Sequence, residues 1–212
     1  MAGLRILITA GPTREHLDTV RFISNPSSGK MGYALAEAAR DRGHRVTLVS
    51  GPVVLDPPAG VRVIRVTSAA EMAAASRKGF AACDVAIFTA AVSDYRPVRR
   101  LPRKAPKRKR AVTVRLEPTE DIAAALGRAK GTRLTVAFAF EDHDGRAHAE
   151  AKMLDKNADA IVLNGPANVG SDRAKVEVLV RGGRWQRWPA GGKRQIAERL
   201  MQLVERLHSR PA

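Results

Sequence analysis

Residues 25–32 (NPSSGKMG) form a serine- and glycine-rich loop that leads directly into a stretch with helical apolar spacing. At the start of a helix the first backbone N–H groups have no partner within the helix, and the helix dipole places partial positive charge there. A phosphate group satisfies both, and glycine lets it approach the backbone closely. The loop therefore predicts a phosphate site, although a helix start that is simply capped by serine fits the same letters.

The loop matches neither of two common nucleotide-binding motifs. A P-loop needs glycine where this chain has Ser24, and serine or threonine where it has Met31. A dinucleotide-binding fold needs G-x-G-x-x-G directly after the first strand and an acidic residue at the end of the second, where this chain has Ser50. The mismatch with the dinucleotide-binding fold argues against a nicotinamide-dependent reductase.

A second candidate region is strongly basic. The 212-residue chain has a formal net charge of +16, and eight of the twelve residues from 99 to 110 are lysine or arginine. Such charge favours an anionic partner, namely nucleic acid, a membrane surface or a phosphorylated small molecule, and a solvated loop is the alternative. Aromatic residues are only 4% of the chain, which argues against single-stranded nucleic acid because its bases need stacking partners. The single cysteine, Cys83, excludes an internal disulfide and a cysteine-based metal site.

Strand-like and helix-like segments alternate along the chain and would position these candidate residues. Buried strands are expected at residues 4–10, 45–50, 61–66, 84–89, 134–140 and 160–163. Helices are expected at residues 29–42, after a capping box of Ser68 and Glu71, and at 119–129, 147–156 and 193–207. The alternation predicts an α/β fold with a doubly wound, Rossmann-like, mostly parallel sheet.

The middle and the end of the chain depart from this pattern. Residues 97–111, with prolines and the basic cluster, are expected to form a flap, and residues 112–116 a strand. Gly182 and Gly183 separate two strand-like runs, 175–180 and 184–188, which predicts a C-terminal β-hairpin before the last helix. With no repeat and no long linker, we expect a single domain over residues 1–212.

The sequence also carries an expectation about location. No stretch approaches the ~20 apolar residues of a membrane helix. The first ten residues run straight into a strand pattern and do not look like a signal peptide. We therefore expect a cytoplasmic protein that does not contact a membrane.

Several long motifs resemble the phosphopantothenate–cysteine ligase (phosphopantothenoylcysteine synthetase) family of coenzyme A biosynthesis. They are GPTREHLDTVRFISNPSSGKMGYALAEAA at residues 11–39, TAAVSDYRP at 89–97, PTEDI at 118–122, AKMLDK at 151–156 and DAIVLN at 159–164. The resemblance covers nearly the whole chain. In bacteria this unit is often fused to a flavin-dependent decarboxylase, so the resemblance implies a stand-alone ligase or an excised domain.

The resemblance implies a two-step ligation of 4′-phosphopantothenate with L-cysteine. The carboxylate would attack the α-phosphate of CTP, giving an acyl-cytidylate and pyrophosphate, and the cysteine amine would then displace CMP. ATP remains open as the nucleotide. The resemblance further implies Mg²⁺ as cofactor, a homodimer, and a separate decarboxylase as a candidate partner.

The resemblance also assigns site residues by position. Ser27, Ser28, Gly29 and Gly32 would bind the triphosphate. Asn25 would lie beside the acyl group, where its amide donates to the acyl oxygen, and Arg21 would serve an anionic group at the active site. Their alternatives are a turn-forming asparagine before Pro26 and a surface arginine.

Two further segments complete this candidate site. Ala90 and Ala91 would allow close approach of the nucleotide or acyl group, and Asp94 would bind ribose, base or metal. On the flap, Lys104 would be catalytic and bind the phosphates, with Lys107 second, because Pro106 replaces one lysine of the family's usual cluster. The family pattern is also altered at residues 137–142 and 169–172, so the pocket wall is expected to differ there.

The alternative function is a basic nucleotide- or nucleic-acid-binding module on the same fold, without ligase activity. Such a module needs only the basic loop and should lose affinity steeply with salt. A ligase needs Asn25 and Asp94 beside the phosphate loop, and both are present. His143 and His148 have no metal-ligand spacing and are expected to be solvated loop residues.

Overall fold

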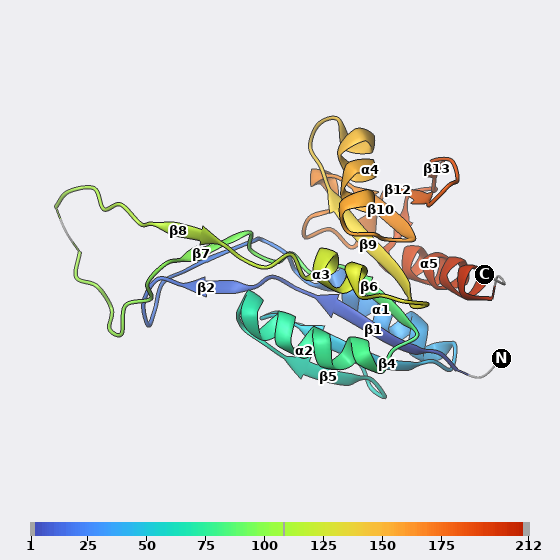
Figure 1. Cartoon of the computed structure of the whole chain (residues 1–212), viewed down its shortest axis with the longest axis horizontal. Helices are drawn as coiled ribbons and strands as arrows, with labels where there is room; N and C mark the ends of the chain where they lie inside the picture. Colours follow the sequence, from blue (N-terminus) through green and yellow to red (C-terminus); the bar gives the residue numbers. More distant parts are fainter. Residues whose placement is uncertain (1–2, 108, 210–212) are drawn as a thin grey trace.

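The computed structural model describes residues 3–107 and 109–209, which build one large sheet with helices on both faces (Figure 1). The sheet order is β13-β12-β10-β9-β6-β1-β4-β5. The strands are β1 (Arg5–Ala10), β4 (Arg45–Ser50), β5 (Arg62–Arg65), β6 (Val85–Phe88), β9 (Leu134–Phe140), β10 (Ala160–Asn164), β12 (Val176–Val180) and β13 (Gln186–Arg187).

The six strands from β10 to β5 in this order are parallel, and β12 and β13 add an antiparallel edge next to β10. The chain places β1 in the middle, adds β4 and β5 on one side, and then returns to add β6, β9 and β10 on the other. Strand order therefore reverses between β1 and β6, the position where open α/β sheets bind ligands. The predicted doubly wound sheet and the C-terminal hairpin are both confirmed.

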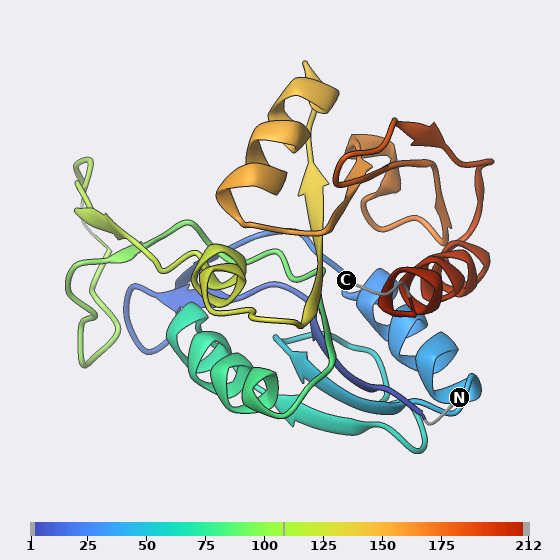
Figure 2. The ribbon, with the colours of Figure 1, turned by 45° about the vertical axis from the view of Figure 1, so that its right-hand side comes forward.

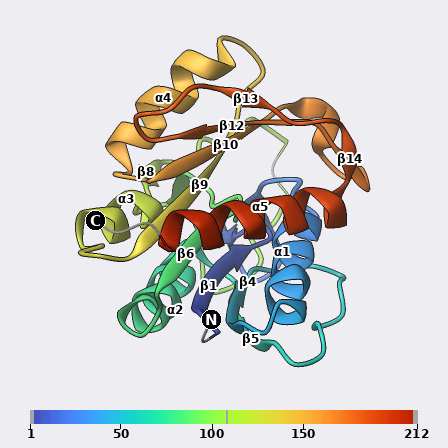
Figure 3. The same cartoon turned by 90° about the vertical axis from the view of Figure 1, so that its right-hand side faces the viewer.

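Helices pack on both faces because alternate strand residues point to opposite sides. Ile6 and Ile8 of β1 pack in a core with α1 (Lys30–Asp41) and α5 (Lys193–His208), which lie side by side in Figure 3. Leu7 points the other way, into a core with α2 (Ala69–Ala81) and α3 (Ile122–Arg128). A third core packs α4 (Gly145–Asp155) on β9 and β10.

The capping box predicted for α2 is present. Ser68 Oγ accepts a hydrogen bond from the Glu71 backbone N–H at 3.2 Å, and Glu71 Oε2 accepts from the Ser68 backbone N–H at 3.4 Å. These reciprocal bonds satisfy two donors that the helix itself cannot. Helix α2 therefore starts at the residue that follows Ser68, as the sequence predicts.

An arm of short strands extends away from the main sheet, to the left in Figure 1. It consists of the hairpin β2 (Arg14–His16) and β3 (Phe22–Ser24), and of β7 (Tyr95–Pro97) paired with β8 (Leu116–Pro118). The strand predicted at residues 112–116 is wrong except for its last residue, because 112–115 form no ladder within the described residues. The basic segment joins β7 to β8 as a long loop, which Figure 2 shows from a second side.

Asp18 holds this basic loop against the β2–β3 turn. Its buried carboxylate, 1% exposed, accepts hydrogen bonds from the backbone N–H groups of Val20 and Arg21, both at 2.8 Å, and of Ala105 at 3.2 Å. Arg21 Nη2 bonds both this carboxylate at 2.5 Å and the Ala105 carbonyl at 2.8 Å. We call the contacts among Asp18, Arg21 and Ala105 the flap clasp.

Two smaller features complete the described part of the chain. A short 3-10 helix, η1, covers Pro166–Asn168, and β11 (Arg173–Ala174) pairs with β14 (Gly191–Gly192) just before α5. In the sequence η1 and β11 lie between β10 and β12, and β14 directly precedes α5. The segment 164–176, which contains η1 and β11, contributes to the lining of a cavity.

The packing of α5 on α1 generates a stability prediction. Leu200 is fully buried in the core that the two helices share. Leu200→Ala should lower the free energy of unfolding by about 2–5 kcal/mol, since it removes buried methyl groups and leaves a cavity. Leu154→Ala, at a leucine that is 63% exposed on α4, is the control and should change it by less than about 0.5 kcal/mol. Urea denaturation followed by circular dichroism measures both, and equal losses would contradict the packing.

The flap clasp generates a second prediction. Hydrogen bonds from the backbone of Arg21 and Val20 hold the pKa of Asp18 well below its usual range. Asp18→Asn should raise the amide exchange rate of the 98–107 segment roughly tenfold at pH 7, the scale of one lost hydrogen bond to a charged group. Because the pKa is lowered on folding, the clasp is fully present above the unfolded value of about 3.9. It is lost as the pH falls through the lower folded value.

Hydrogen exchange read by mass spectrometry tests the clasp directly. The difference between the wild-type chain and Asp18→Asn should be complete at pH 7 and shrink in strongly acidic solution. Asp41→Asn is the matched control, because Asp41 also pairs with arginines but lies on α1. A faster amide exchange of the flap in Asp41→Asn, or an unchanged exchange rate in Asp18→Asn, would contradict the flap clasp.

Candidate active site

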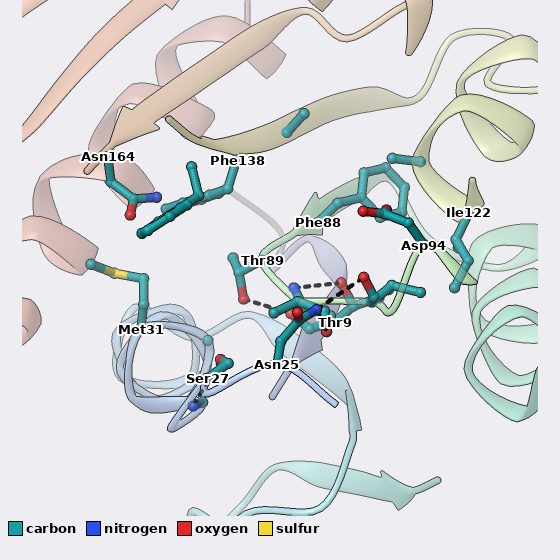
Figure 4. Close-up of a pocket in the computed structure, with 18 of the residues that line it drawn as sticks. Thr9, Asn25, Ser27, Met31, Phe88, Thr89, Asp94, Ile122, Phe138 and Asn164 are labelled. Atoms are coloured by element: carbon teal, nitrogen blue, oxygen red, sulfur yellow. Dashed lines mark hydrogen bonds between the residues drawn. The ribbon is translucent and has the colours of Figure 1, made fainter. Parts of the chain in front are cut away.

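A cavity of about 860 Å³ lies at the carboxyl ends of the central strands, where the strand order reverses. Its lining comes from Thr9, Lys193 and parts of the segments 25–32, 88–95, 118–123, 137–140, 152–156 and 164–176. Figure 4 shows Asn25, Ser27, Asp94 and Phe138 arranged around it. Cavities of about 300–1,000 Å³ are typical of small-molecule sites.

The glycine loop forms one wall of the cavity. Helix α1 begins at Lys30 behind the N-cap residue Gly29, which has a φ of 74° and no side-chain cap. Serine capping, the alternative to a phosphate site, is therefore wrong for this helix. Ser27 Oγ instead accepts from the Gly29 backbone N–H at 3.4 Å within the loop. The first residues of α1 line the cavity, and no side chain accepts a hydrogen bond at the cap, as an anion site requires.

Gly32 lets this helix start approach the sheet closely. A methyl group at Gly32 would lie 2.4 Å from Ala10 Cβ at the end of β1 and 2.7 Å from Thr89 Oγ1 beyond β6. The Thr89 hydroxyl is itself fixed by donating to the Thr9 carbonyl at 2.6 Å. Any larger residue would push α1 away from the ends of both strands.

Asn25 ties the glycine loop to the segment that follows β6. Its side-chain nitrogen Nδ2 donates to the carbonyls of Ala91 at 3.0 Å and Val92 at 3.2 Å. The Ala91 N–H in turn donates to the Gly11 carbonyl at 2.9 Å. The predicted neighbours Asn25, Ala90 and Ala91 therefore do lie together on the cavity wall.

Asp94 lies on the same wall, with an exposed side chain. Its backbone carbonyl accepts from the Thr119 N–H at 2.8 Å, but its carboxylate makes no hydrogen bond to the described residues. The described residues contain no cluster of three His, Cys, Asp or Glu that would hold a metal ion by itself. One carboxylate combined with phosphate oxygens and water is a normal Mg²⁺ environment, so the donor set fits that ion once a nucleotide is bound.

Three predicted site residues do not line the cavity. Arg21 belongs to the flap clasp, and Lys104 and Lys107 are exposed on the loop that joins β7 to β8. Lys104 directly precedes Ala105, so the clasp fixes the backbone beside it. The structure thus separates the flap from the cavity, and the roles inferred for these residues stay predictions. Arg108, in the middle of the flap, lies outside the described residues.

Sequence reasoning gave no role to several cavity residues. Lys152 of α4 and Lys156, which directly follows this helix, reach the cavity and are held by carboxylates, Lys152 by Glu141 at 2.6 Å and Lys156 by Asp121. Their i,i+4 spacing inside the family-like motif at 151–156 was the available signal. Phe138 adds an apolar surface. His148 was expected in a loop but belongs to α4, and it lies 3.4 Å from Glu141.

Two further lysines lie at the other end of the cavity. Lys30 pairs with Asp172 at 2.5 Å, and Lys193 donates to the Asn168 carbonyl at 3.2 Å. Burial lowers the pKa of Lys193, and the nearby charge of Lys30 lowers it further. The cavity is therefore lined by four lysines from three segments of the sequence, which suits a ligand with several negative charges. None of the described helices is both long enough and apolar enough to cross a membrane.

Comparisons with known proteins agree with this geometry. Residues 1–207 match the family described as "DNA/pantothenate metabolism flavoprotein C-terminal domain". The "Coenzyme A biosynthesis bifunctional protein CoaBC" of Bacillus subtilis (strain 168) is 41% identical over 212 residues, covering 98% of this chain and 52% of the relative. A prokaryotic "Cysteine/Cysteine sulfinic acid decarboxylase" is also 41% identical, over 95% of this chain and 58% of the relative. The chain thus spans about half the length of these curated relatives.

One solved structure aligns with this chain over almost the full length of both chains. The crystal structure of the C-terminal domain of a coenzyme A biosynthesis bifunctional protein CoaBC superposes with a TM-score of 0.84 at 40% identity, over 98% of this chain and 96% of that one. The resemblance inferred from the motifs is confirmed. The chain belongs to the DNA/pantothenate metabolism flavoprotein C-terminal domain family.

Proposed function

We propose that this chain joins 4′-phosphopantothenate to L-cysteine at the expense of CTP, giving CMP and pyrophosphate. One observation carries the proposal. The uncapped start of α1 and the Ala90–Asp94 segment line a single cavity, inside a family in which a relative carries the name of coenzyme A biosynthesis. A module that only binds nucleic acid through the flap would need neither segment. We further propose that residues 1–212 act as one cytoplasmic domain.

The proposed reaction needs positioning and charge stabilisation rather than an enzyme nucleophile. A carboxylate oxygen of phosphopantothenate attacks the α-phosphorus of CTP, and pyrophosphate leaves with the electrons of the broken P–O bond. The cysteine amine then attacks the acyl carbon of the acyl-cytidylate, an amide bond forms, and CMP leaves as the amine loses a proton. N–H groups of Ser28, Gly29 and Lys30 would stabilise charge on the triphosphate.

We propose that the remaining predicted residues act when the ligands are bound. The flap would bring Lys104, and secondarily Lys107, to the phosphates, while Arg21 would serve an anionic group. Mg²⁺, held by Asp94 and phosphate oxygens, would neutralise the triphosphate. A homodimer is also proposed, because the arm exposes the apolar side chains of Val20, Phe22 and Tyr95.

A mass-based assay tests the proposed function. The purified chain is incubated with phosphopantothenate, cysteine, Mg²⁺ and each nucleoside triphosphate in turn, and the products are identified by mass. We expect phosphopantothenoylcysteine, CMP and pyrophosphate with CTP. A folded chain that consumes no triphosphate in the presence of phosphopantothenate would rule the function out. Product formation with ATP alone would correct the nucleotide and leave the ligation intact.

Asn25→Asp should separate the two half-reactions. In the second step negative charge develops on the acyl oxygen, where an amide donates and a carboxylate repels. The first step places its charge on the α-phosphate, beside the helix start. We therefore expect the variant to release pyrophosphate while product forms at least about 10²-fold more slowly, so that acyl-cytidylate accumulates. Rapid quench with labelled CTP measures both steps.

The observed contacts of Asn25 supply the alternative outcome. Because its Nδ2 holds the Ala91 and Val92 carbonyls, aspartate could instead distort the wall of the cavity. Equal loss of both half-reactions would assign Asn25 to shaping the site and remove it from the catalytic residues. Asn168→Asp, at an asparagine whose side chain bonds only the Lys175 backbone among the described residues, is the control for a new charge in the cavity.

A further inference from the structure

The two helices that lie side by side on one face of the sheet each begin with a lysine that lines the cavity. Lys30 opens α1 and Lys193 opens α5. The segment 168–172 passes between them. Lys30 Nζ contacts the Gly170 carbonyl at 3.3 Å, Lys193 Nζ contacts the Asn168 carbonyl at 3.2 Å, and the Lys193 backbone N–H donates to the Asp172 carbonyl at 2.9 Å.

The charges at this end of the cavity do not balance. Asp172 supplies one carboxylate, which pairs with Lys30 but is 84% exposed. Lys193 has only a neutral carbonyl as its partner among the described residues, and it is half-buried. Burial and the nearby Lys30 charge both disfavour its ammonium form, and together they outweigh the opposite effect of the Asp172 carboxylate, so the pKa of Lys193 is lowered. An anion placed between the two lysines would relieve both effects.

The backbone contributes further donors at the same end. The N-cap residues of both helices are glycines, Gly29 and Gly192, so neither supplies a side-chain oxygen to the first N–H groups. Gln195 caps only the Gly192 N–H, at 3.0 Å. Helices of 12 and 16 residues therefore direct the positive ends of their dipoles towards the lysine pair.

We propose that Lys193 and Lys30 form a phosphoryl-binding subsite at the end of the glycine loop. The identity of the ligand rests on the proposed function, which supplies two phosphoryl sources for one cavity. One is the 4′-phosphate of phosphopantothenate, and the other is the β,γ-end of the triphosphate. In either case the subsite fixes the end of a substrate that lies far from the reacting carboxyl group, so that binding energy there positions the reacting atoms.

A solely structural role for Lys193 makes a different prediction. If Lys193 only held the 168–172 segment, Lys193→Gln would retain a donor for the Asn168 carbonyl and leave ligand affinity largely unchanged. In a phosphoryl subsite the charge itself matters, because a charge-assisted bond to phosphate is about twice as strong as a neutral one. Lys193→Arg should then keep most of the affinity that Lys193→Gln loses.

The experiment measures affinity with paired ligands by calorimetry. One arm compares phosphopantothenate with pantothenate, and the other compares CTP with CMP, each for the wild-type chain, Lys193→Gln and Lys193→Arg. Lys78→Gln, at an exposed lysine on α2 outside the cavity, is the matched control. We expect Lys193→Gln to weaken the phosphorylated member of one pair roughly tenfold and its partner less than about twofold. Circular dichroism checks that each variant is folded.

Each outcome decides the proposal. A selective loss in the first arm assigns the subsite to the 4′-phosphate, and one in the second arm assigns it to the nucleotide. Equal losses for both members of each pair, or the same losses in Lys78→Gln, would overturn it. Pyrophosphate binding is measured in parallel, because it does not depend on ligase activity. If the wild-type chain fails to use phosphopantothenate, the proposed function falls, and a tenfold weaker binding of pyrophosphate by Lys193→Gln still supports the subsite.

Discussion

The close approach of α1 to the ends of β1 and β6 is the constraint on which the rest of the site depends. It exists because position 32 has no side chain, so the helix can start within van der Waals distance of Ala10 and Thr89. This contact places the start of α1 on the cavity wall, and it brings the preceding loop close enough for Asn25 to bond the Ala91 carbonyl. One wall of the cavity is thus built mainly from backbone, whose dipoles are fixed before a ligand arrives.

The positive charge of the chain is distributed in two different ways. Around the cavity, Lys30, Lys152 and Lys156 are each paired with a carboxylate. These ion pairs hold the lysine side chains in place and offset part of the positive charge of the cavity wall. On the flap, the lysines are exposed, and backbone hydrogen bonds join the segment to the β2–β3 turn at Leu101, whose N–H donates to the Leu17 carbonyl, and at Ala105. Under the proposed function, a triphosphate in the cavity would meet the paired lysines, and the flap lysines would reach it only after a movement of the arm.

The sequence was sufficient for the parts of the structure that local patterns determine. The strands at 45–50 and 134–140 have the predicted limits, because long buried apolar runs have few alternatives. The arm was missed because β2 and β3 have three residues each and depend on the Asp18 contacts rather than on periodicity. In the site, the loop at 25–32 carries its own signal. Lys193 reaches the same cavity from the far end of the chain, through the packing of α5 on α1, which no local pattern encodes.

The exchange of labelled pyrophosphate into CTP tests the central claim most directly, namely that a single cavity activates the acid before cysteine enters. This exchange arises when the first step runs backwards, so it needs phosphopantothenate but not cysteine. We predict exchange with phosphopantothenate and Mg²⁺ alone, and its loss in Gly32→Ala, in which the added methyl group pushes α1 away from the strands. Exchange that needs cysteine, or that is as fast in Gly32→Ala as in the wild-type chain, would contradict the account.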